Sequence, residues 1–168
     1  MNAMDTARSF LQEIAMSQSV KLAGGIVLAI CTSLASAQST LGALLDAEAK
    51  PLTADMFRQE VVRRVIVGPT AAGGSLEVVY TENGSVEGTG THPNLPMLYG
   101  QNSPIDGQWT IDDQNRICTA MVIKAQAGNT IANLPRRCQF WFKSGDSFYI
   151  SDSDSDRSAK VLKRMVKQ

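Results

Sequence analysis

The sequence contains a single histidine, His92, and it lacks the residue patterns that most enzyme mechanisms require. A catalytic histidine works with a nucleophile and an orienting acid, and neither a G-x-S-x-G elbow nor a comparable motif is present. His92 stands in the loop sequence "GTHPN", where an exposed histidine without a catalytic task is the ordinary case. The sequence therefore predicts no catalytic residue and no cofactor.

An excess of charge of either sign is also lacking, because 16 basic residues balance 16 acidic ones. A general nucleic-acid binder needs a basic excess that displaces counterions from phosphates. Nucleic acid is therefore not an expected partner. The chain also contains no internal repeat that would indicate a solenoid or propeller.

Cysteine is scarce, and the three cysteines (Cys31, Cys118 and Cys138) form no C-x-x-C pair. This spacing disfavours a thiol redox centre. A zinc ligand set is not expected either, because His92 is the only histidine of the sequence and Cys31, in the apolar run at residues 22–37, is expected to be removed on export, so no metal site is predicted.

Residues 22–37, "LAGGIVLAICTSLASA", form the longest apolar run and carry no charge. Lys21 precedes this run, and Ala35 and Ala37 occupy the small-residue positions of an A-x-A cleavage site. The run has 16 residues, which is fewer than the roughly 20 that a membrane-spanning helix needs. A buried helix is disfavoured because the run has no polar face. We therefore interpret residues 1–37 as a signal peptide that is cut between Ala37 and Gln38, which leaves no permanent membrane anchor.

Two alternatives concern this segment. Met16 begins the compact basic segment "MSQSVK", so translation can start at Met16 rather than at Met1. Cys31 raises the alternative of a lipoprotein, but Ile30 stands where lipid attachment generally needs a small residue. Cleavage after Ala37 is the interpretation that we favour, and it places the protein in the periplasm or the extracellular medium.

The 131 residues that remain after cleavage (168 minus 37) are enough for one domain with its own core. They keep Cys118 and Cys138, and two thiols in a small exported domain most often form a disulfide. Such a bond would close a loop of about 21 residues and add on the order of 3 kcal/mol to the free energy of unfolding. We expect a structural disulfide.

The first part of the mature chain has a helical pattern. Residues 38–52 form a helical lead-in, and residues 53–168 form a single β-rich domain. Thr53 can cap a helix in which Phe57, Val61 and Val65 share one apolar face, and "VGPTAAGG" ends that helix.

From residue 75 the hydrophobic pattern changes to a period of two, and Asn83-Gly84 is a strong hairpin signal. The segment 91–107 contains three prolines and is expected to be a loop, as is "AQAGNTIANLPR" at 125–136. About seven strands, joined mostly by short turns, are expected in an antiparallel meander at 75–82, 85–91, 108–112, 116–124, 137–144, 147–151 and 159–167.

The cysteines suggest which strand faces meet. Cys118, Ala120 and Val122 share one face, and Cys138, Phe140 and Phe142 share another, so a disulfide would bring both faces into a common interior. The opposite face of the first strand, with Ile117, Met121 and Ile123, is also apolar and needs a cover. We predict an α+β fold, mainly antiparallel β: a bent sheet or half-open small barrel with one or two N-terminal helices packed on it.

Acidic residues form two groups. Asp152, Asp154 and Asp156 have the first spacings of an EF-hand loop, but Arg157 and Lys163 replace the required Gly and Glu. A solvated turn is the favoured interpretation, with weak cation binding left open. Asp106, Asp112 and Asp113 lie near Trp109, a possible sugar platform, although Asp112-Asp113 also fits a turn.

Two further features could form a surface for a ligand or a partner. Trp141 lies on the same face of its strand as Gln139 and Lys143, so it is expected to face outward. The ordinary explanation for an outward-facing Trp is that the N-terminal helices cover it. Trp109, and His92 and Tyr99 in the long loop, complete this candidate surface. The tail "RSAKVLKRMVK" has five basic residues and no acid, which fits a lysine-protected edge strand or, alternatively, a site for an anionic partner.

The mature chain resembles small exported proteins of unknown function that are common in proteobacteria. The features that carry this resemblance are "LTADMFRQEVV", the "GP" break, "VVYTENGSVEG", and "GQW" followed by Cys118 and Cys138, within residues 41–166. The resemblance implies a periplasmic or secreted β-rich domain and brings no catalytic residues.

The function favoured by the sequence is a non-enzymatic binding module for a small apolar ligand, an envelope component or another protein. The alternative is an inhibitor or immunity-type protein that blocks a secreted enzyme through the loop at 91–107. A small hydrolase that uses the acids near Trp109 is the third hypothesis.

Overall fold

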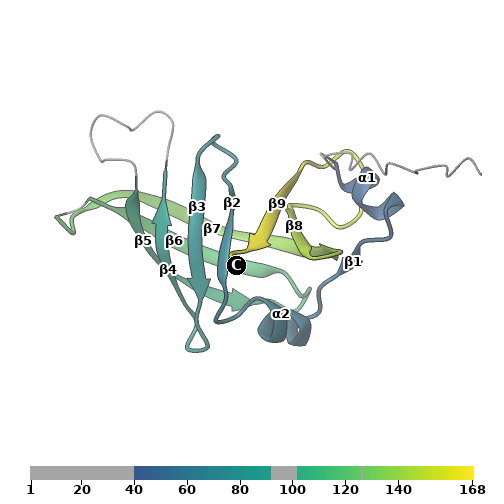
Figure 1. Ribbon diagram of the computed structural model, residues 1–168, viewed down its shortest axis with the longest axis horizontal. Helices are drawn as coiled ribbons and strands as arrows, with labels where there is room; N and C mark the ends of the chain where they lie inside the picture. The colour runs from purple at the N-terminus through teal and green to yellow at the C-terminus, as the bar shows by residue number, and fades with distance from the viewer. Residues whose placement is uncertain (1–39, 92–101, 126) are drawn as a thin grey trace, which may run out of the picture. The chain divides into compact units, whose positions relative to one another are not determined.

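Eight antiparallel strands close into an up-and-down barrel in which each strand pairs with its neighbours in the chain (Figure 1). This computed structural model describes residues 40–91, 102–125 and 127–168, all of which belong to one compact unit that spans residues 36–168. The predicted signal peptide, with Met16, Cys31 and the Ala37–Gln38 bond, lies outside the described residues. The barrel strands are β2 Val65–Pro69, β3 Ser75–Tyr80, β4 Ser85–Gly90, β5 Ser103–Ile111, β6 Ile117–Lys124, β7 Thr130–Ser144, β8 Ser147–Ser151 and β9 Val161–Val166.

The first and last barrel strands close the sheet. β2 pairs with β9 through Ile66 with Val166 and Val67 with Met165, while β7 and β8 pair as a hairpin. The prediction of a mainly antiparallel α+β fold is confirmed, but the half-open barrel with seven strands is wrong, since the barrel is closed and has eight. The predicted edge strand at 159–167 is also wrong, because β9 has β2 on one side and β8 on the other.

β7 is the longest strand and contributes to two regions of the sheet. Its first part pairs with β6 as far as Gln139, and its last part pairs with β8. The short strand β1 Lys50–Pro51 adds to the same edge of β7 beyond β6, opposite Phe142 and Lys143. The loop predicted at 125–136 is therefore confined to the turn before Thr130.

The structure shortens a second predicted loop and a predicted helix. β5 begins at Ser103, so only part of the predicted loop at 91–107 lies outside the strands. The helix α2 Ala54–Glu60 is capped by the Thr53 side chain, which accepts a hydrogen bond from the Met56 backbone amide at 3.3 Å. It ends before Val65, which is in β2, because the β-branched run at this point pairs with β3.

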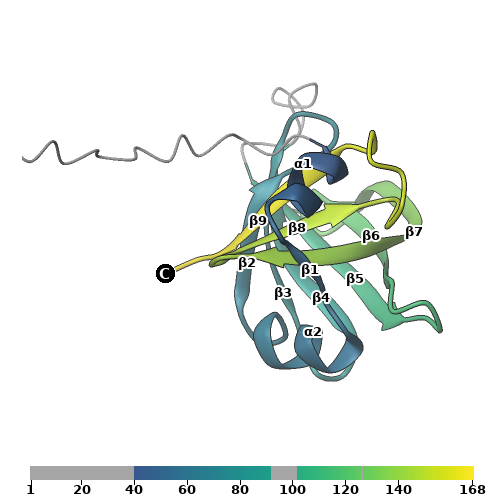
Figure 2. The ribbon, with the colours of Figure 1, turned by 90° about the vertical axis from the view of Figure 1, so that its right-hand side faces the viewer.

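The helix α2 lies across one end of the barrel (Figures 1 and 2). Phe57 enters the barrel from this helix, and its ring centroid lies 5.4 Å from Tyr80, 5.3 Å from Trp109 and 5.1 Å from Trp141. Phe148 extends the cluster through a 6.3 Å contact with Trp141. These five aromatic side chains fill the interior at this end, which we call the closed end.

The helix α1 Leu41–Asp46 covers a separate cluster outside the barrel. Leu41 and Leu44 from this helix pack with Phe142, Tyr149 and Val161, which face outward from β7, β8 and β9. Strand alternation explains the division, because Trp141, Phe148 and Ile150 point into the barrel from the same strands. The predicted cover by N-terminal helices is present, with α1 outside the barrel and α2 at its end.

The predicted disulfide between Cys118 and Cys138 is confirmed, and it joins directly opposite residues of β6 and β7. It lies on the outer face of the barrel, so the predicted common interior of the cysteine-bearing faces is wrong. Ile117, Met121 and Ile123 line the inside instead. The disulfide is consistent with an oxidising compartment. Among the described residues, no helix is both long enough and apolar enough to cross a membrane.

Candidate functional site

The barrel contains a cavity of about 300 Å³ at the end opposite α2, which we call the open end. Residues from the β2–β3 turn, the last part of β4 and the first part of β5 line it, together with residues from β6, β7, β8 and β9. At the closed end, Phe57 and its aromatic neighbours pack against one another. The cavity therefore lies at the end of the barrel that α2 does not cover (Figure 1).

Most of the cavity wall is apolar, although five Ser and Thr residues also line it: Thr70, Ser75, Thr91, Ser103 and Thr119. Two residues shape it in different ways: Leu134 is 37 % exposed although it is a large apolar side chain, and Gly90 leaves space that Ile105 occupies. The aliphatic side chains that surround the cavity are Leu76, Ile105, Met121, Ile123, Leu134, Ile150 and Leu162.

A buried arginine, Arg164, interrupts this apolar wall. Arg164 is 5 % exposed and is the one charged side chain among the buried residues that the structure describes. Its Nη1 donates hydrogen bonds to the backbone carbonyl oxygens of Pro69 at 2.6 Å and Lys163 at 3.0 Å. Buried arginines are rare unless a carboxylate balances their charge, and Arg164 forms no ion pair with any described residue.

Gly68 makes room for the Arg164 side chain. A Cβ atom at Gly68 would lie 2.8 Å from Nη1 of Arg164 and 2.4 Å from the carbonyl oxygen of Lys163. Any larger residue at this position would therefore displace the guanidinium group or the β9 backbone. The inward position of Arg164 depends on a glycine in the neighbouring strand.

Burial changes the ionisation of Arg164 and of Tyr80. Desolvation lowers the pKa of Arg164 from its ordinary value, and the nearby Tyr80 partly offsets that effect. Desolvation raises the pKa of Tyr80 to about 12, while the charge of Arg164 acts in the opposite direction. Tyr80 is consequently a neutral phenol near pH 7 and cannot balance the guanidinium charge.

A second arginine of the cavity wall does have an acidic partner. Arg137 donates to Asp152 at 2.6 Å, and the amide of Gln139 donates to the other carboxylate oxygen of Asp152 at 2.8 Å. These side chains are more exposed than Arg164 and lie at the rim of the cavity. The charges of Arg137 and Asp152 at the rim balance each other, whereas Arg164 inside the cavity has no carboxylate partner among the described residues.

The structure does not support the outward-facing tryptophan that the sequence suggested. Trp141 is 4 % exposed and packs in the aromatic cluster, so the predicted orientation is wrong. Trp109 is 8 % exposed, and its indole nitrogen donates to the carbonyl oxygen of Thr81 at 2.9 Å. His92 and Tyr99 lie outside the described residues.

The acids near Trp109 do not converge on its ring. Asp106 faces outward from β5, where it pairs with Lys124, and Asp113 is an exposed turn residue. Asp112 accepts hydrogen bonds from the backbone amides of Arg116 at 2.9 Å and Gln114 at 3.1 Å. The described acids therefore form no carboxylate pair across a cleft at Trp109, as glycoside hydrolysis would need.

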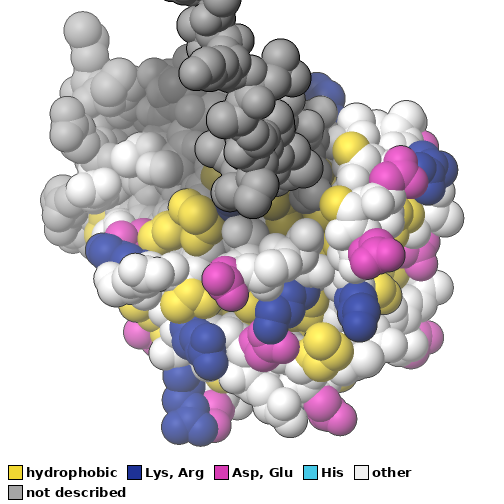
Figure 3. Space-filling model, turned by 45° about the vertical axis from the view of Figure 1, so that its right-hand side comes forward, with side chains coloured by type: hydrophobic (Ala, Val, Ile, Leu, Met, Phe, Trp, Pro, Cys, Tyr) yellow, Lys and Arg dark blue, Asp and Glu magenta, His cyan; other side chains and the backbone are white. Residues whose placement is uncertain are grey.

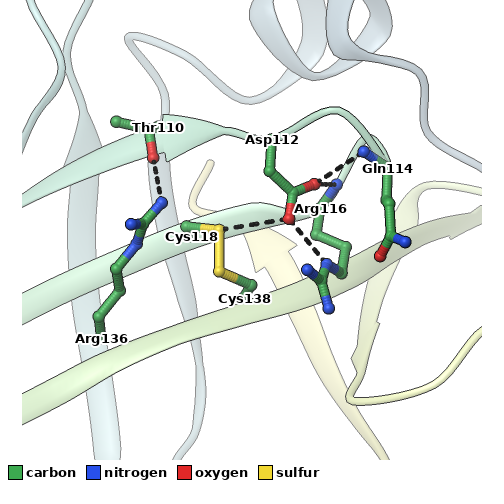
Figure 4. Close-up of a disulfide and its surroundings, with 7 residues drawn as sticks. All are labelled: Thr110, Asp112, Gln114, Arg116, Cys118, Arg136 and Cys138. Atoms are coloured by element: carbon green, nitrogen blue, oxygen red, sulfur yellow. Dashed lines mark hydrogen bonds and ion pairs between the residues drawn. A yellow bond between two sulfur atoms is a disulfide. The ribbon is translucent and has the colours of Figure 1, made fainter.

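Asp112 lies against the disulfide (Figure 4). Its Oδ2 is 3.8 Å from the sulfur of Cys118 and accepts a 2.8 Å hydrogen bond from Nε of Arg116. Desolvation raises the pKa of Asp112, but the hydrogen bonds from Arg116 and Gln114 outweigh it, so the pKa lies below its ordinary value. The side chains of Asp112, Cys118 and Cys138 lie close enough together for a metal site. The two cysteine sulfurs are bonded to each other, however, and are therefore not thiolate ligands.

The acidic segment after β8 is a hydrogen-bonded turn. Asp156 accepts hydrogen bonds from the backbone amide and the hydroxyl of Ser158 at 2.9 and 2.7 Å, which lower its pKa. Asp152 is occupied by Arg137 and Gln139, as described above. These carboxylates form no converging group with Asp154, and the interpretation of a solvated turn fits this geometry.

Charges on the described outer surface are mixed. On the face that Figure 3 shows, Lys and Arg side chains are interspersed with Asp and Glu side chains, and no patch of one sign extends across it. Exposed ion pairs such as Arg63 with Glu82 at 2.7 Å contribute to this pattern. The inward-facing Arg164 therefore stands apart from the surface charges in both position and balance.

Comparison of the chain with protein-family models, with curated proteins and with solved structures finds no match. The resemblance to small exported proteobacterial proteins consequently stays a prediction, and the arguments about function that follow depend on the cavity itself.

Sequence reasoning missed the cavity and Arg164. One signal was available, because the basic tail that contains Arg164 also suggested a site for an anionic partner. The tail was interpreted as an exposed strand, whereas strand closure turns one of its cations into the barrel.

Proposed function

We propose that this protein is a non-enzymatic binding protein that holds one small, mostly apolar ligand in the open end of the barrel. The observation that carries the proposal is the aliphatic cavity of about 300 Å³ inside a barrel whose other end is filled by Phe57 and its aromatic neighbours. Eight-stranded barrels have interiors that side chains can fill completely or that can enclose one small ligand. Ligand sites are typically concave, apolar and equipped with a few polar groups, as this cavity is.

The cavity volume indicates the size of the ligand. A cavity of about 300 Å³ lies at the lower end of the roughly 300–1,000 Å³ that is typical of small-molecule sites. A small ligand therefore suits it, and a straight aliphatic chain suits the apolar part of its wall. 1-Octanol is a neutral probe of this size.

Export remains part of the proposal. The apolar run at 22–37 and the A-x-A site support cleavage after Ala37, and the disulfide agrees with a periplasmic or secreted location. In that setting the ligand would be a small apolar molecule of the cell envelope or the medium.

The test is binding of 1-octanol to the full chain, followed by nuclear magnetic resonance shifts of backbone amides. Ile123→Trp puts a large ring into the cavity, and Val122→Trp puts the same ring on the opposite, outer face of β6. Both positions are half-buried aliphatic residues in one strand, so they form a matched pair. We expect Ile123→Trp to weaken binding at least tenfold and Val122→Trp to leave it within twofold of the unmodified protein.

Shifts confined to residues outside the cavity, or equal weakening by both substitutions, would contradict the proposed site. The proposed function would be contradicted if neither 1-octanol, at its solubility limit, nor an amphiphile with the same alkyl chain and a charged head group showed saturable binding.

A further inference from the structure

Arg164 places an unbalanced positive charge inside the proposed ligand site. Transfer of a charged group from water into an apolar interior is costly unless a counter-charge and hydrogen bonds compensate for it. The two backbone carbonyls that Arg164 contacts bond to Nη1 alone. Among the described residues, Nε and Nη2 have no hydrogen-bond partner, although Arg164 is only 5 % exposed.

The groups around Arg164 do not supply the missing negative charge. Tyr80 is neutral near pH 7, Asp152 is engaged by Arg137 and Gln139, and Glu77 faces outward, where it pairs with Lys167 at 2.8 Å. Gly68 keeps the space in which the guanidinium lies. The wall is therefore arranged to hold a cation that the described part of the protein leaves unbalanced.

We propose that the ligand is an amphiphile with one carboxylate, and that the carboxylate binds to Arg164 while the aliphatic chain lies along the apolar wall. This inference rests on the proposed function and assigns the chemical class of its ligand. A single guanidinium balances a single negative charge, and its planar fork matches a carboxylate in two parallel hydrogen bonds. Leu162 lies two positions before Arg164 on the interior face of β9, and Ile150 lies opposite Leu162 on β8, so both provide apolar contacts for the chain.

The modest volume of the cavity favours a short chain. Octanoate, a saturated acid of eight carbons, is therefore a suitable probe. Octanoate and 1-octanol have the same chain and differ mainly in the charged group. They are therefore matched probes for the role of Arg164.

The test compares the dissociation constants of octanoate and 1-octanol for the full chain by isothermal titration calorimetry at pH 7. We expect the unmodified protein to bind octanoate at least tenfold more tightly than 1-octanol, which corresponds to about 1.4 kcal/mol. Arg164→Gln should remove this preference, so that the dissociation constants of octanoate and 1-octanol for this variant lie within twofold of each other. Arg164→Lys keeps the charge but not the fork, and it should retain part of the preference.

Thermal unfolding of each variant establishes that the barrel is folded, since Arg164 also bonds to the Pro69 and Lys163 carbonyls. If Arg164→Gln fails to fold, Arg164→Lys is tested in its place. A preference for octanoate over 1-octanol that is the same in the folded variant as in the unmodified protein would overturn the inference. Equal affinity for the two probes in the unmodified protein would overturn the carboxylate assignment but not the proposed function. If neither octanoate nor 1-octanol binds, the carboxylate assignment and the proposed function are both overturned.

Discussion

The two ends of the barrel are built from the same eight strands, but one interior is packed with aromatic side chains and the other contains a cavity. At the closed end, Phe57 brings α2 against Tyr80, Trp109 and Trp141, and the rings occupy the interior. At the open end, aliphatic side chains surround a space of about 300 Å³, and Arg164 faces inward without an ion-pair partner among the described residues. The comparison indicates that packing at the closed end stabilises the fold, while the open end leaves the space that we propose as the ligand site.

The largest expected effect is at the closed end. Trp141→Ala should lower the free energy of unfolding by about 3–5 kcal/mol, because it removes a large aromatic side chain from a packed cluster. Leu134→Ala, at the open end and 37 % exposed, should lower it by less than about 1 kcal/mol. Urea unfolding followed by tryptophan fluorescence measures both, with Trp109 as the fluorophore that remains in Trp141→Ala. Similar losses for the two variants would remove the distinction between the ends.

A smaller effect is expected at the open end for Gly68→Ala. The new Cβ would lie 2.4 Å from the Lys163 carbonyl oxygen and 2.8 Å from Nη1 of Arg164, so the arginine must move. We expect a loss of about 1–3 kcal/mol in unfolding free energy and loss of the preference for octanoate over 1-octanol. Gly145→Ala is the control, because that turn glycine has φ +57° and no atom within 4 Å of the added Cβ. It should destabilise the protein but keep the ligand preference, and a lost preference there would show that instability alone abolishes it.

The smallest effect is a pH dependence at Asp112, in the hairpin turn after Trp109. The native pKa of Asp112 lies below its ordinary value of 3.8, so folding favours the ionised form. Its contribution to stability is fully present above that ordinary value and is lost as the pH falls through the lower native pKa. Asp112→Asn should therefore be less stable than the unmodified protein at pH 7, with a difference that shrinks below pH 4. Urea unfolding at several pH values measures this difference, and Asp113→Asn, at the exposed neighbour, is the matched control. A difference independent of pH would contradict the role of the Asp112 charge.

The local features of the fold were predictable from the sequence. The alternation of apolar residues, the Asn83-Gly84 turn and the pair Cys118 and Cys138 are short-range signals, and the structure contains the corresponding strands and the disulfide. Thr53 caps α2 as predicted. Each of these features depends on neighbours in the chain or on one cross-strand pair.

Closure of the barrel was not predictable in the same way. Whether β9 is an edge strand or the partner of β2 depends on sheet curvature, which no single strand specifies. Strand phase was also ambiguous in β9, since Leu162, Arg164 and Val166 share one face while Val161, Lys163 and Met165 share the other. Both faces combine apolar and basic residues.

Trp141 illustrates the same ambiguity in β7. Its neighbours on the same face are Gln139, at the rim of the cavity, and Lys143, which pairs with Glu60 of α2 at the other end of the barrel. One face of a strand that crosses a small barrel from rim to rim is polar at its extremes and buried in the middle. The polar neighbours therefore suggested exposure for a residue in the centre of the core.

The β2–β9 seam has a consequence for the order of folding. It joins Val67 and Met165, which are 98 positions apart in the chain, whereas every other barrel pairing is a hairpin between consecutive strands. The hairpins can form early, and the cysteines of β6 and β7 can meet within one of them, but β2 must keep an unpaired edge until the last strand arrives. Such long-range pairing belongs to topologies that fold in about milliseconds to seconds, and an unpaired edge is open to association with other chains in that interval. Pairing of β2 with β9 thus closes the barrel and removes the last unpaired strand edges of the meander.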